Sequence, residues 1–348
     1  MPDVPTFDPR NHDLRAKLAS IVATFDEPFD PDLAQLGLKA ILGIYPPMWR
    51  QGNFRMLEPV VADGIEAAKR MNVSDAEATL TVRLAALKEA LGEWAQVEQL
   101  ANGMRIPLGD GHLAMELGIH AGTAAHNLGG YRKALGIFEK ALGLPLSQVD
   151  RDRILHKRHR TLKALGRNRE ALATVDAIIF SVGESNPTFL AELLLDKADL
   201  VRRSDPDQAL ALAGRAATAY GKAEHERGLA YAQLELGRTY LRLGKREPAT
   251  TNFALARRLF DDSRYLPGQA HVRVGQGQLL AASGQHLRAA ELFAEAADCA
   301  RQVAYQAVFL RACAYEVAAL VRAGRIWRAL IPARRMVKPV LNALQQRL

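Results

Sequence analysis

The stretch AYAQLELGRTYLRLGKREPATTNFALARRLFDD, residues 230–262, predicts two helices joined by a glycine turn. Apolar residues recur at helical spacing on both sides of Gly244. This glycine can end the first helix because it adopts the left-handed C-cap conformation without a steric penalty. Gly237, Ala249 and Ala256 are small, and we expect Gly237 to face the two alanines where the helices approach closely.

Working outward from this hairpin, the same kind of turn recurs along the chain. Its markers are Gly52, Gly92, Gly129, Gly166, Ser204, Gly244, Gly284 and Gly324. They lie 40, 37, 37, 38, 40, 40 and 40 residues apart, a period typical of stacked helical hairpins. Because each repeat of such an array contacts only its neighbours, the 348 residues can continue as one body. The spacing therefore predicts an all-α solenoid.

The residues around Gly244 resemble the tetratricopeptide repeat. The pattern is Leu236-Gly237-x-x-Tyr240, Gly244, Ala249, Phe253 and Ala256, and matching positions in two other copies are Gly122, Gly129, Tyr131, Ala134, Phe138 and Ala141, then Gly277, Gly284, Ala289, Phe293 and Ala296. The resemblance covers about residues 33–348 and implies a right-handed α-solenoid of about eight hairpins.

The period of about 40 residues exceeds the family's usual length of about 34. It resembles the long-hairpin variant in sensor arrays of bacterial signal-transduction ATPases and transcription regulators, and residues 48–80 are similar to the opening of such arrays. Those regulators carry a GxxxxGK[ST] phosphate loop, and no such string occurs here. A sensor of this kind is therefore expected to be a stand-alone one.

Three segments are expected. Residues 1–32 form an acidic, Pro-rich leader with one short helix around residues 13–25, residues 33–324 form the solenoid, and residues 325–348 form a capping helix. The apolar residues of this capping helix are expected to face the core; they are Ile326, Leu330, Val337, Leu341, Leu344 and Leu348. Pro332 and Pro339 should kink or split the helix. The alternative is a basic arm for an anionic surface. Without a signal-like apolar segment, we expect a cytoplasmic protein that does not insert into membranes.

The net charge of +8 is unevenly distributed. The first 32 residues carry seven acids and three bases, whereas the last 27 carry seven bases and no acid. Residues 151–170 add a further run with eight arginines and lysines. Such runs can attract phosphates or acidic peptides, and they can equally be solvated helix faces.

Sequence signatures of catalysis are few. No HExxH, CxxC or GxSxG string occurs, and Cys299 and Cys313 are expected to be small buried apolar residues. His156 and His159 could share a helix face with His120 and His126 of the preceding helix. Because no carboxylate accompanies them at matched spacing, we expect no metal site and no cofactor. The chain is expected not to be an enzyme.

In tetratricopeptide repeats the first helix of each hairpin lines the concave surface. Carried over from this resemblance, the partner-binding residues are His120, Thr123, His126, Asn127, Arg153, His156, Lys157, Arg160, Lys163, Arg202, Tyr231, Arg238, Arg242, His271, Gln278, Arg311 and Tyr315, with Glu235 among them. The guanidinium group of arginine favours carboxylates and phosphates because it can donate hydrogen bonds to two of their oxygens at once. The prediction is a non-catalytic protein- or peptide-binding scaffold or sensor in a bacterial-type regulatory complex, with a basic groove for an acidic partner. The alternative is a nucleic-acid-associated repeat protein that contacts phosphates through the same face.

Overall fold

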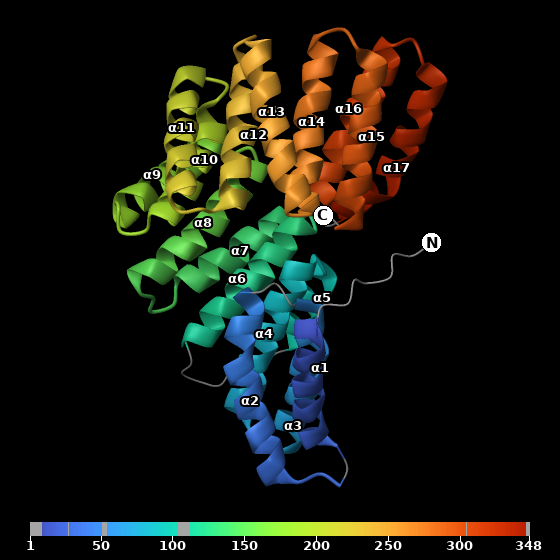
Figure 1. Cartoon of the computed structure of the whole chain (residues 1–348). Helices are drawn as coiled ribbons and strands as arrows, with labels where there is room; N and C mark the ends of the chain where they lie inside the picture. The colour runs from blue at the N-terminus through green and yellow to red at the C-terminus, as the bar shows by residue number, and fades with distance from the viewer. Residues whose placement is uncertain (1–8, 27, 51–53, 104–110, 304, 346–348) are drawn as a thin grey trace. The chain divides into compact units, whose positions relative to one another are not determined.

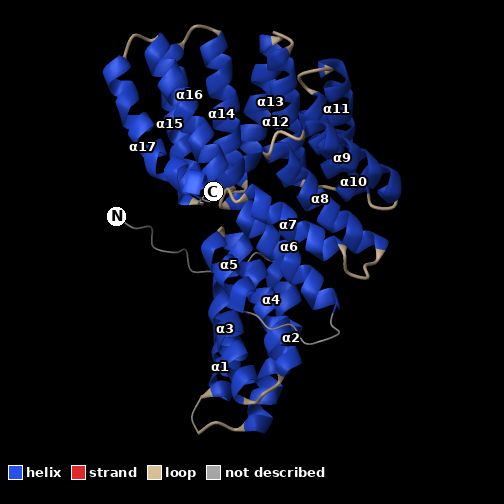
Figure 2. Ribbon diagram, turned by 180° about the vertical axis from the view of Figure 1, so that it is seen from behind, coloured by secondary structure: helices blue, strands red, loops and turns tan. Residues whose placement is uncertain are grey.

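The computed structural model describes residues 9–26, 28–50, 54–103, 111–303 and 305–345. Within these ranges the chain forms 17 α-helices, one short 3-10 helix and no strand (Figures 1 and 2). The all-α prediction is confirmed. The turn marker Gly52 lies outside the described residues. No helix in the described part of the chain is long and apolar enough to cross a bilayer.

The helices follow one another as eight hairpins, each with a first helix A and a second helix B. The first four pairs are α2 (Pro31–Arg50) with α3 (Phe54–Arg70), α4 (Ser74–Leu91) with α5 (Trp94–Gly103), α6 (Gly111–Asn127) with α7 (Tyr131–Leu142), and α8 (Gln148–Ala164) with α9 (Asn168–Val182). The last four are α10 (Pro187–Val201) with α11 (Pro206–Lys222), α12 (Glu226–Arg242) with α13 (Arg246–Asp262), α14 (Leu266–Ala282) with α15 (His286–Gln302), and α16 (Gln306–Arg322) with α17 (Ile326–Gln345). The predicted number of hairpins is confirmed.

The 40-residue period has a simple geometric origin. From α11 to α16 every helix has 17 residues and every connection has three, so two helices and two connections make one period. The helices B of the second and third hairpins are shorter, at 10 residues in α5 and 12 in α7. They fall in the part of the chain where the markers are 37 residues apart.

The turn between helices A and B depends on glycine in six hairpins. The φ angles of these glycines lie between 72° and 88°, in the left-handed region that favours glycine, at Gly92, Gly129, Gly166, Gly244, Gly284 and Gly324. The marker Ser204 also lies in a turn between helices A and B, as predicted, but it does not have a positive φ. Four residues separate α10 from α11, and Asp205 caps α11 by accepting a hydrogen bond of 2.9 Å from the backbone N–H of Gln208.

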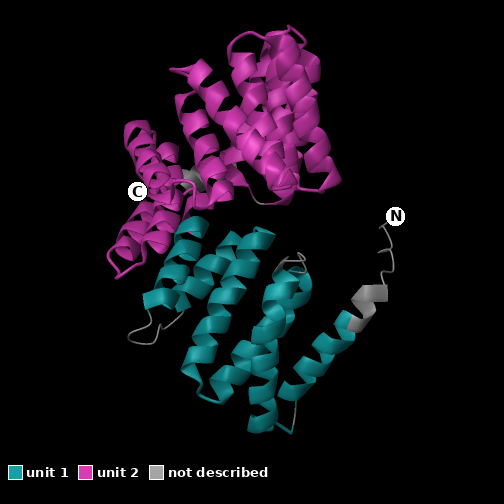
Figure 3. Cartoon of the chain, turned by 60° about the vertical axis from the view of Figure 1, so that its left-hand side comes forward, with its two compact units in different colours: residues 1–124 teal, residues 125–348 magenta. Residues whose placement is uncertain are grey.

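The helices group into two compact units, residues 1–124 and residues 125–348 (Figure 3). In the first unit, α1 (Pro9–Val22) and the 3-10 helix η1 (Ala23–Phe25) contribute Leu18 and Phe25 to the core that holds Ala34, Leu38 and Ile41 of the first hairpin. The expected leader helix therefore packs on the array. The segment boundaries expected from the sequence stay predictions.

In the second unit, aromatic rings of helices B fill the space that glycines of helices A leave. A Cβ atom on Gly237 would lie 2.7 Å from the ring of Phe253, and one on Gly275 of the next hairpin would lie 2.6 Å from the same ring. The prediction that Gly237 and Ala256 are buried is confirmed. The nearest neighbour of Gly237 is however the Phe253 ring, not Ala249 or Ala256. Large rings can pack deeply here only because glycine carries no side chain.

The last helix differs from its expected form. α17 continues through Pro332 and Pro339, so the prolines do not split it. Ile326, Leu330 and Val337 are 64%, 48% and 54% exposed, so the expected inward stripe is wrong at these positions. The buried residues of α17 include Ala329, which repeats at a 40-residue interval the buried Ala289. The side chains of Leu341, Leu344 and Leu348 lie outside the described residues.

Candidate functional site

A series of polar side chains, joined by hydrogen bonds and ion pairs, crosses the helices A of the second unit. It joins α8, α10, α12, α14 and α16, and we call it the helix-A ladder; its members are Lys163, Asp199, Arg202, Glu235, Arg238, His271 and Arg311. Consecutive helices A are neighbours in the array, so side chains 33 to 40 residues apart in sequence meet across them.

The first part of the ladder is a set of ion pairs of alternating sign. Asp199 accepts from Lys163 and lies 2.7 Å from Nη2 of Arg202. Arg202 also pairs with the buried Glu235, whose other oxygen lies 3.6 Å from Nη1 of Arg238. Acids of α10 and α12 therefore neutralise much of the basic charge expected from the sequence. Glu235 was among the residues expected here, whereas Asp199 was missed.

The far end of the ladder has a different composition. Nη2 atoms of Arg238 and Arg311 each lie 3.2 Å from Nδ1 of His271. Burial, and then the charges of the two arginines, hold the pKa of His271 well below its ordinary value. The imidazole is therefore neutral, and its single Nδ1 lone pair accepts from both guanidinium groups. Within the described ranges, no carboxylate lies within ion-pair distance of Arg311.

Two further cations and two tyrosines surround this end. Arg160 and Lys163 of α8 add to the positive potential that lowers the pKa of His271. The ring of Tyr305 meets the His271 ring edge-on at 5.5 Å between centroids, and that of Tyr231 does so at 6.3 Å. The arginine pair of the ladder, Arg238 and Arg311, is thus set among rings and additional positive charge.

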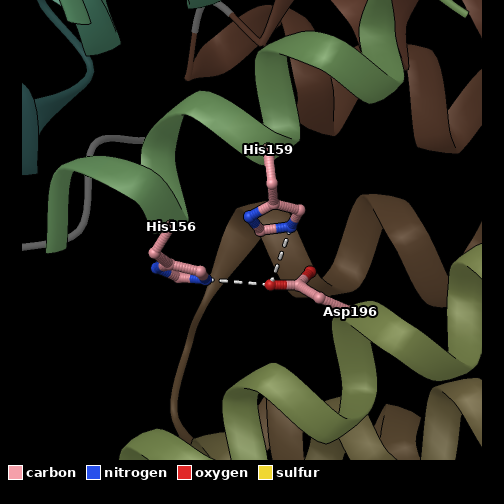
Figure 4. Close-up of side chains that lie close together, drawn as sticks. All are labelled: His156, His159 and Asp196. Carbon is pink, nitrogen blue, oxygen red and sulfur yellow. Dashed lines mark hydrogen bonds and ion pairs between the residues drawn. The ribbon is translucent and has the colours of Figure 1, made fainter. Parts of the chain in front are cut away.

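A second polar cluster lies between α8 and α10 (Figure 4). Nε2 of His156 is 2.8 Å from Oδ2 of Asp196, and Nε2 of His159 is 3.2 Å from the same oxygen. Burial raises the pKa of Asp196, but the two imidazoles hold it well below its ordinary value, so the group is a carboxylate. The expectation that no carboxylate accompanies these histidines is wrong. Asp196 lies 40 residues beyond His156, one full repeat period, and that separation is the signal that could have found it.

The remaining expected residues fall in several places. In the first unit, Nδ1 of His120 lies 2.6 Å from the carboxylate of Glu89, and Thr123 donates to the carbonyl of Ile119 in its own helix. In the second unit, His126 lies 3.0 Å from the hydroxyl of Thr161. The sequence therefore placed polar residues on helices A correctly, but not all of them belong to one cluster.

Other expected residues stand apart from the ladder. Arg153 pairs with Asp150 at the start of α8, at 3.4 Å, and Arg242 is exposed in the last turn of α12. Asn127 and Lys157 are half-buried. Gln278 and Tyr315 line a shallow depression of about 260 Å³, where the Tyr315 ring packs on Phe293 at 5.3 Å. Cys313 is buried as expected, and Cys299 is partly exposed.

Comparison with known proteins identifies the fold. No family model matches the sequence, and no curated protein matches it. A solved Rap protein complexed with Competence and Sporulation Factor has a TM-score of 0.59 and 14% identity, with 77% of each chain covered. A tetratricopeptide repeat protein from Parabacteroides merdae has a TM-score of 0.52 and 16% identity, with 78% of this chain and 97% of that chain covered. The eight hairpins, the glycine turns and this likeness together show that the chain has the fold of the tetratricopeptide-repeat proteins.

Proposed function

We propose that this chain is a non-catalytic scaffold or sensor whose helix-A ladder binds an acidic protein or peptide. The observation that carries the proposal is the convergence of Arg238 and Arg311 on the neutral His271. A carboxylate has two oxygens that accept hydrogen bonds from a guanidinium fork, whereas Nδ1 offers one lone pair for two donors. A partner carboxylate would therefore satisfy both arginines better than His271 does.

The surroundings favour a peptide as the source of that carboxylate. Tyr231 and Tyr305 offer ring surface to the apolar part of a neighbouring residue, and aromatic side chains of this kind are enriched at protein interfaces. Lys163 and Arg202 are already paired with acids of the array. Selectivity for an acidic group would then be concentrated at the arginine pair.

The fold supports a binding role in general terms. Stacked helical repeats present extended surfaces to partners, and function in such arrays depends on the particular side chains displayed. The Rap protein of similar fold was solved in complex with Competence and Sporulation Factor. We propose that the present chain uses its repeats in the same general way, as a holder of a partner molecule.

The test compares wild type with Arg238→Gln/Arg311→Gln on an immobilised peptide library. Each acidic peptide is printed beside a copy in which Asp and Glu are replaced by Asn and Gln. Wild type should select acidic members, and the double variant should bind them with a loss of about 1.5 to 3 kcal/mol for each charge-assisted contact. Arg258→Gln is the matched control, since the Arg258 side chain is 79% exposed on α13.

Two outcomes would contradict the proposal. Equal binding to the acidic and amidated copies would show that the partner is not recognised by its acidic groups. A double variant that binds acidic peptides as tightly as wild type would show that the arginine pair is not the binding site. A labelled single-stranded oligonucleotide tests the nucleic-acid alternative. Binding that weakens steeply with salt and depends on the same arginines would favour phosphate recognition instead.

A further inference from the structure

We propose that His156, His159, Asp196 and Glu192 bind one divalent transition-metal ion of the Zn²⁺ type. The two histidines are three residues apart on α8, and the two carboxylates are four residues apart on α10. Each pair therefore shares one face of its helix. The side chains of His156, His159 and Asp196 converge from the two helices (Figure 4).

The separations of the ligand atoms fit a tetrahedral ion. Bonds of about 2.0–2.2 Å to nitrogen and oxygen place two ligand atoms of such an ion about 3.4 Å apart. Oδ2 of Asp196 lies 2.8 Å from Nε2 of His156 and 3.2 Å from Nε2 of His159, while Oε1 of Glu192 lies 3.6 Å from Nε2 of His156. One ligand atom from each of His156, His159 and Asp196 can be chosen so that all three lie within 4.8 Å of one another. Small side-chain rotations would bring the set around one ion.

His159 provides an independent indication that a ligand is expected. Its side chain is completely buried, and Nδ1 has no hydrogen-bond partner, while Nε2 lies 3.2 Å from the Asp196 carboxylate but not in hydrogen-bond geometry. A buried polar atom without a partner costs free energy, so such atoms are rare in folded proteins. A metal ion bound to Nε2 would replace this poorly aligned contact with Asp196 by a bond, with the proton on Nδ1.

The charges of the ligands suit a divalent cation. A neutral imidazole is the form that binds metals, and His156 and His159 each supply one. Two carboxylates balance the two positive charges of the ion. Imidazole with carboxylate is a ligand set used by Zn²⁺ and its neighbours, whereas Ca²⁺ and Mg²⁺ prefer oxygen ligands alone.

Arg160 directly follows His159 in the sequence, and its positive charge would repel a cation bound at this cluster. Replacing Arg160 by glutamine should therefore tighten metal binding. A cluster that served only to hold α8 against α10 would gain no affinity for metal from this change.

The experiment titrates Zn²⁺, and separately Co²⁺, into untagged, chelator-treated full-length chain by calorimetry. We expect one ion per chain, and for Co²⁺ the visible absorption of a tetrahedral complex. His159→Asn and Asp196→Asn should abolish this binding. Glu192→Gln should weaken it about tenfold or more, since losing even an outer-shell partner has effects of that size. Glu192 is half-exposed, so its replacement leaves the contacts of Asp196 intact.

His112→Ala is the matched control for adventitious binding to an exposed histidine. Metal-free melting curves check that each variant folds, and Zn²⁺ should raise the melting temperature of wild type but not of His159→Asn. The proposal is overturned if wild type binds no stoichiometric Zn²⁺ or Co²⁺. It is equally overturned if a folded Glu192→Gln or His159→Asn variant binds the metal as wild type does.

Discussion

At the scale of single residues, the fold of the second unit depends on glycines that make room for aromatic rings. Phe253 lies between Gly237 and Gly275, and the same arrangement brings Phe260 against Gly268. Each ring contacts a helix backbone at a distance that a Cβ atom would not permit. These glycines are therefore required by packing, whereas the turn glycines are required by backbone conformation.

Gly237→Ala should destabilise the protein because its Cβ would lie 2.7 Å from the Phe253 ring. We expect a loss of about 1 to 3 kcal/mol, as for other overpacked cores, measured by urea unfolding. The matched control is Gly214→Ala in α11, where a Cβ would meet nothing within 4 Å. That change should stabilise the helix by about 0.5 to 1 kcal/mol. Similar shifts in both variants would mean that Gly237 does not face the ring.

The half-buried histidine His126 should make stability depend on pH. Burial, followed by the charges of Arg160 and Lys157, lowers the pKa of His126 from 6.5 to about 3. Between these values the unfolded chain binds a proton that the folded chain does not. The contribution of His126 to the free energy of unfolding is therefore complete above pH 6.5 and is lost as the pH falls toward 3. The loss at pH 5 is about 2 kcal/mol.

The measurement is urea unfolding of wild type and His126→Asn at pH 7 and pH 5. The variant should lose less stability on acidification than wild type does. An equal loss in the two proteins would show that His126 titrates normally in the folded state.

At the scale of helices and turns, the sequence was most reliable where glycine marks the turn. The six left-handed glycines end their helices where the pattern predicted, because no other residue adopts that backbone so readily. The turn marked by Ser204 is also present, but there Asp205 starts the next helix by side-chain capping. α17 was misassigned at Ile326, Leu330 and Val337 because an apolar stripe without its packing partner does not fix which face is buried.

The turn between α10 and α11 allows a test of this difference. Asp205→Ala should cost about 0.5 to 2 kcal/mol, since it removes the hydrogen bond to the N–H of Gln208. Ser204→Gly, the change toward the other copies, should bring no gain because Ser204 does not have a positive φ. Thermal melts of the two variants measure both effects. A stabilised Ser204→Gly protein would contradict the assignment of this turn.

The candidate site was predictable only in part. The repeat register placed Arg238, His271 and Arg311 on helices A and Arg202 at the end of one, and these four residues do join one ladder. The register did not indicate which acids they meet. Asp199 pairs with Lys163 across a separation of 36 residues, and such contacts depend on the rotation of each helix as well as on the period.

At the scale of the whole molecule, the two compact units were not foreseen from a period that runs through both of them. The second unit ends at α17, which contributes Ala329 to a core with Ala319 and Leu320 of α16. Because each repeat is stabilised by its neighbours, removing the last helix leaves one face of α16 without a partner.

Deleting residues 326–348 should therefore lower the melting temperature and promote aggregation, since the exposed apolar surface of α16 would be open to other molecules. Calorimetry and light scattering measure the two effects. Trp327→Ser is a suitable control, because Trp327 is 84% exposed and contributes little to the core. A truncated chain that melts like the full chain, but no longer binds anionic vesicles, would identify α17 as a separate binding arm.

The uniform length of the later helices also bears on how such a chain can change in length. From α11 to α16, equivalent positions such as Phe253 and Phe293, or Gly237 and Gly277, recur at an interval of 40 residues. A segment of that length could be duplicated or excised here, and the joint would bring together surfaces that already match. The number of repeats, and with it the span available to a partner, can therefore vary without the invention of a new interface.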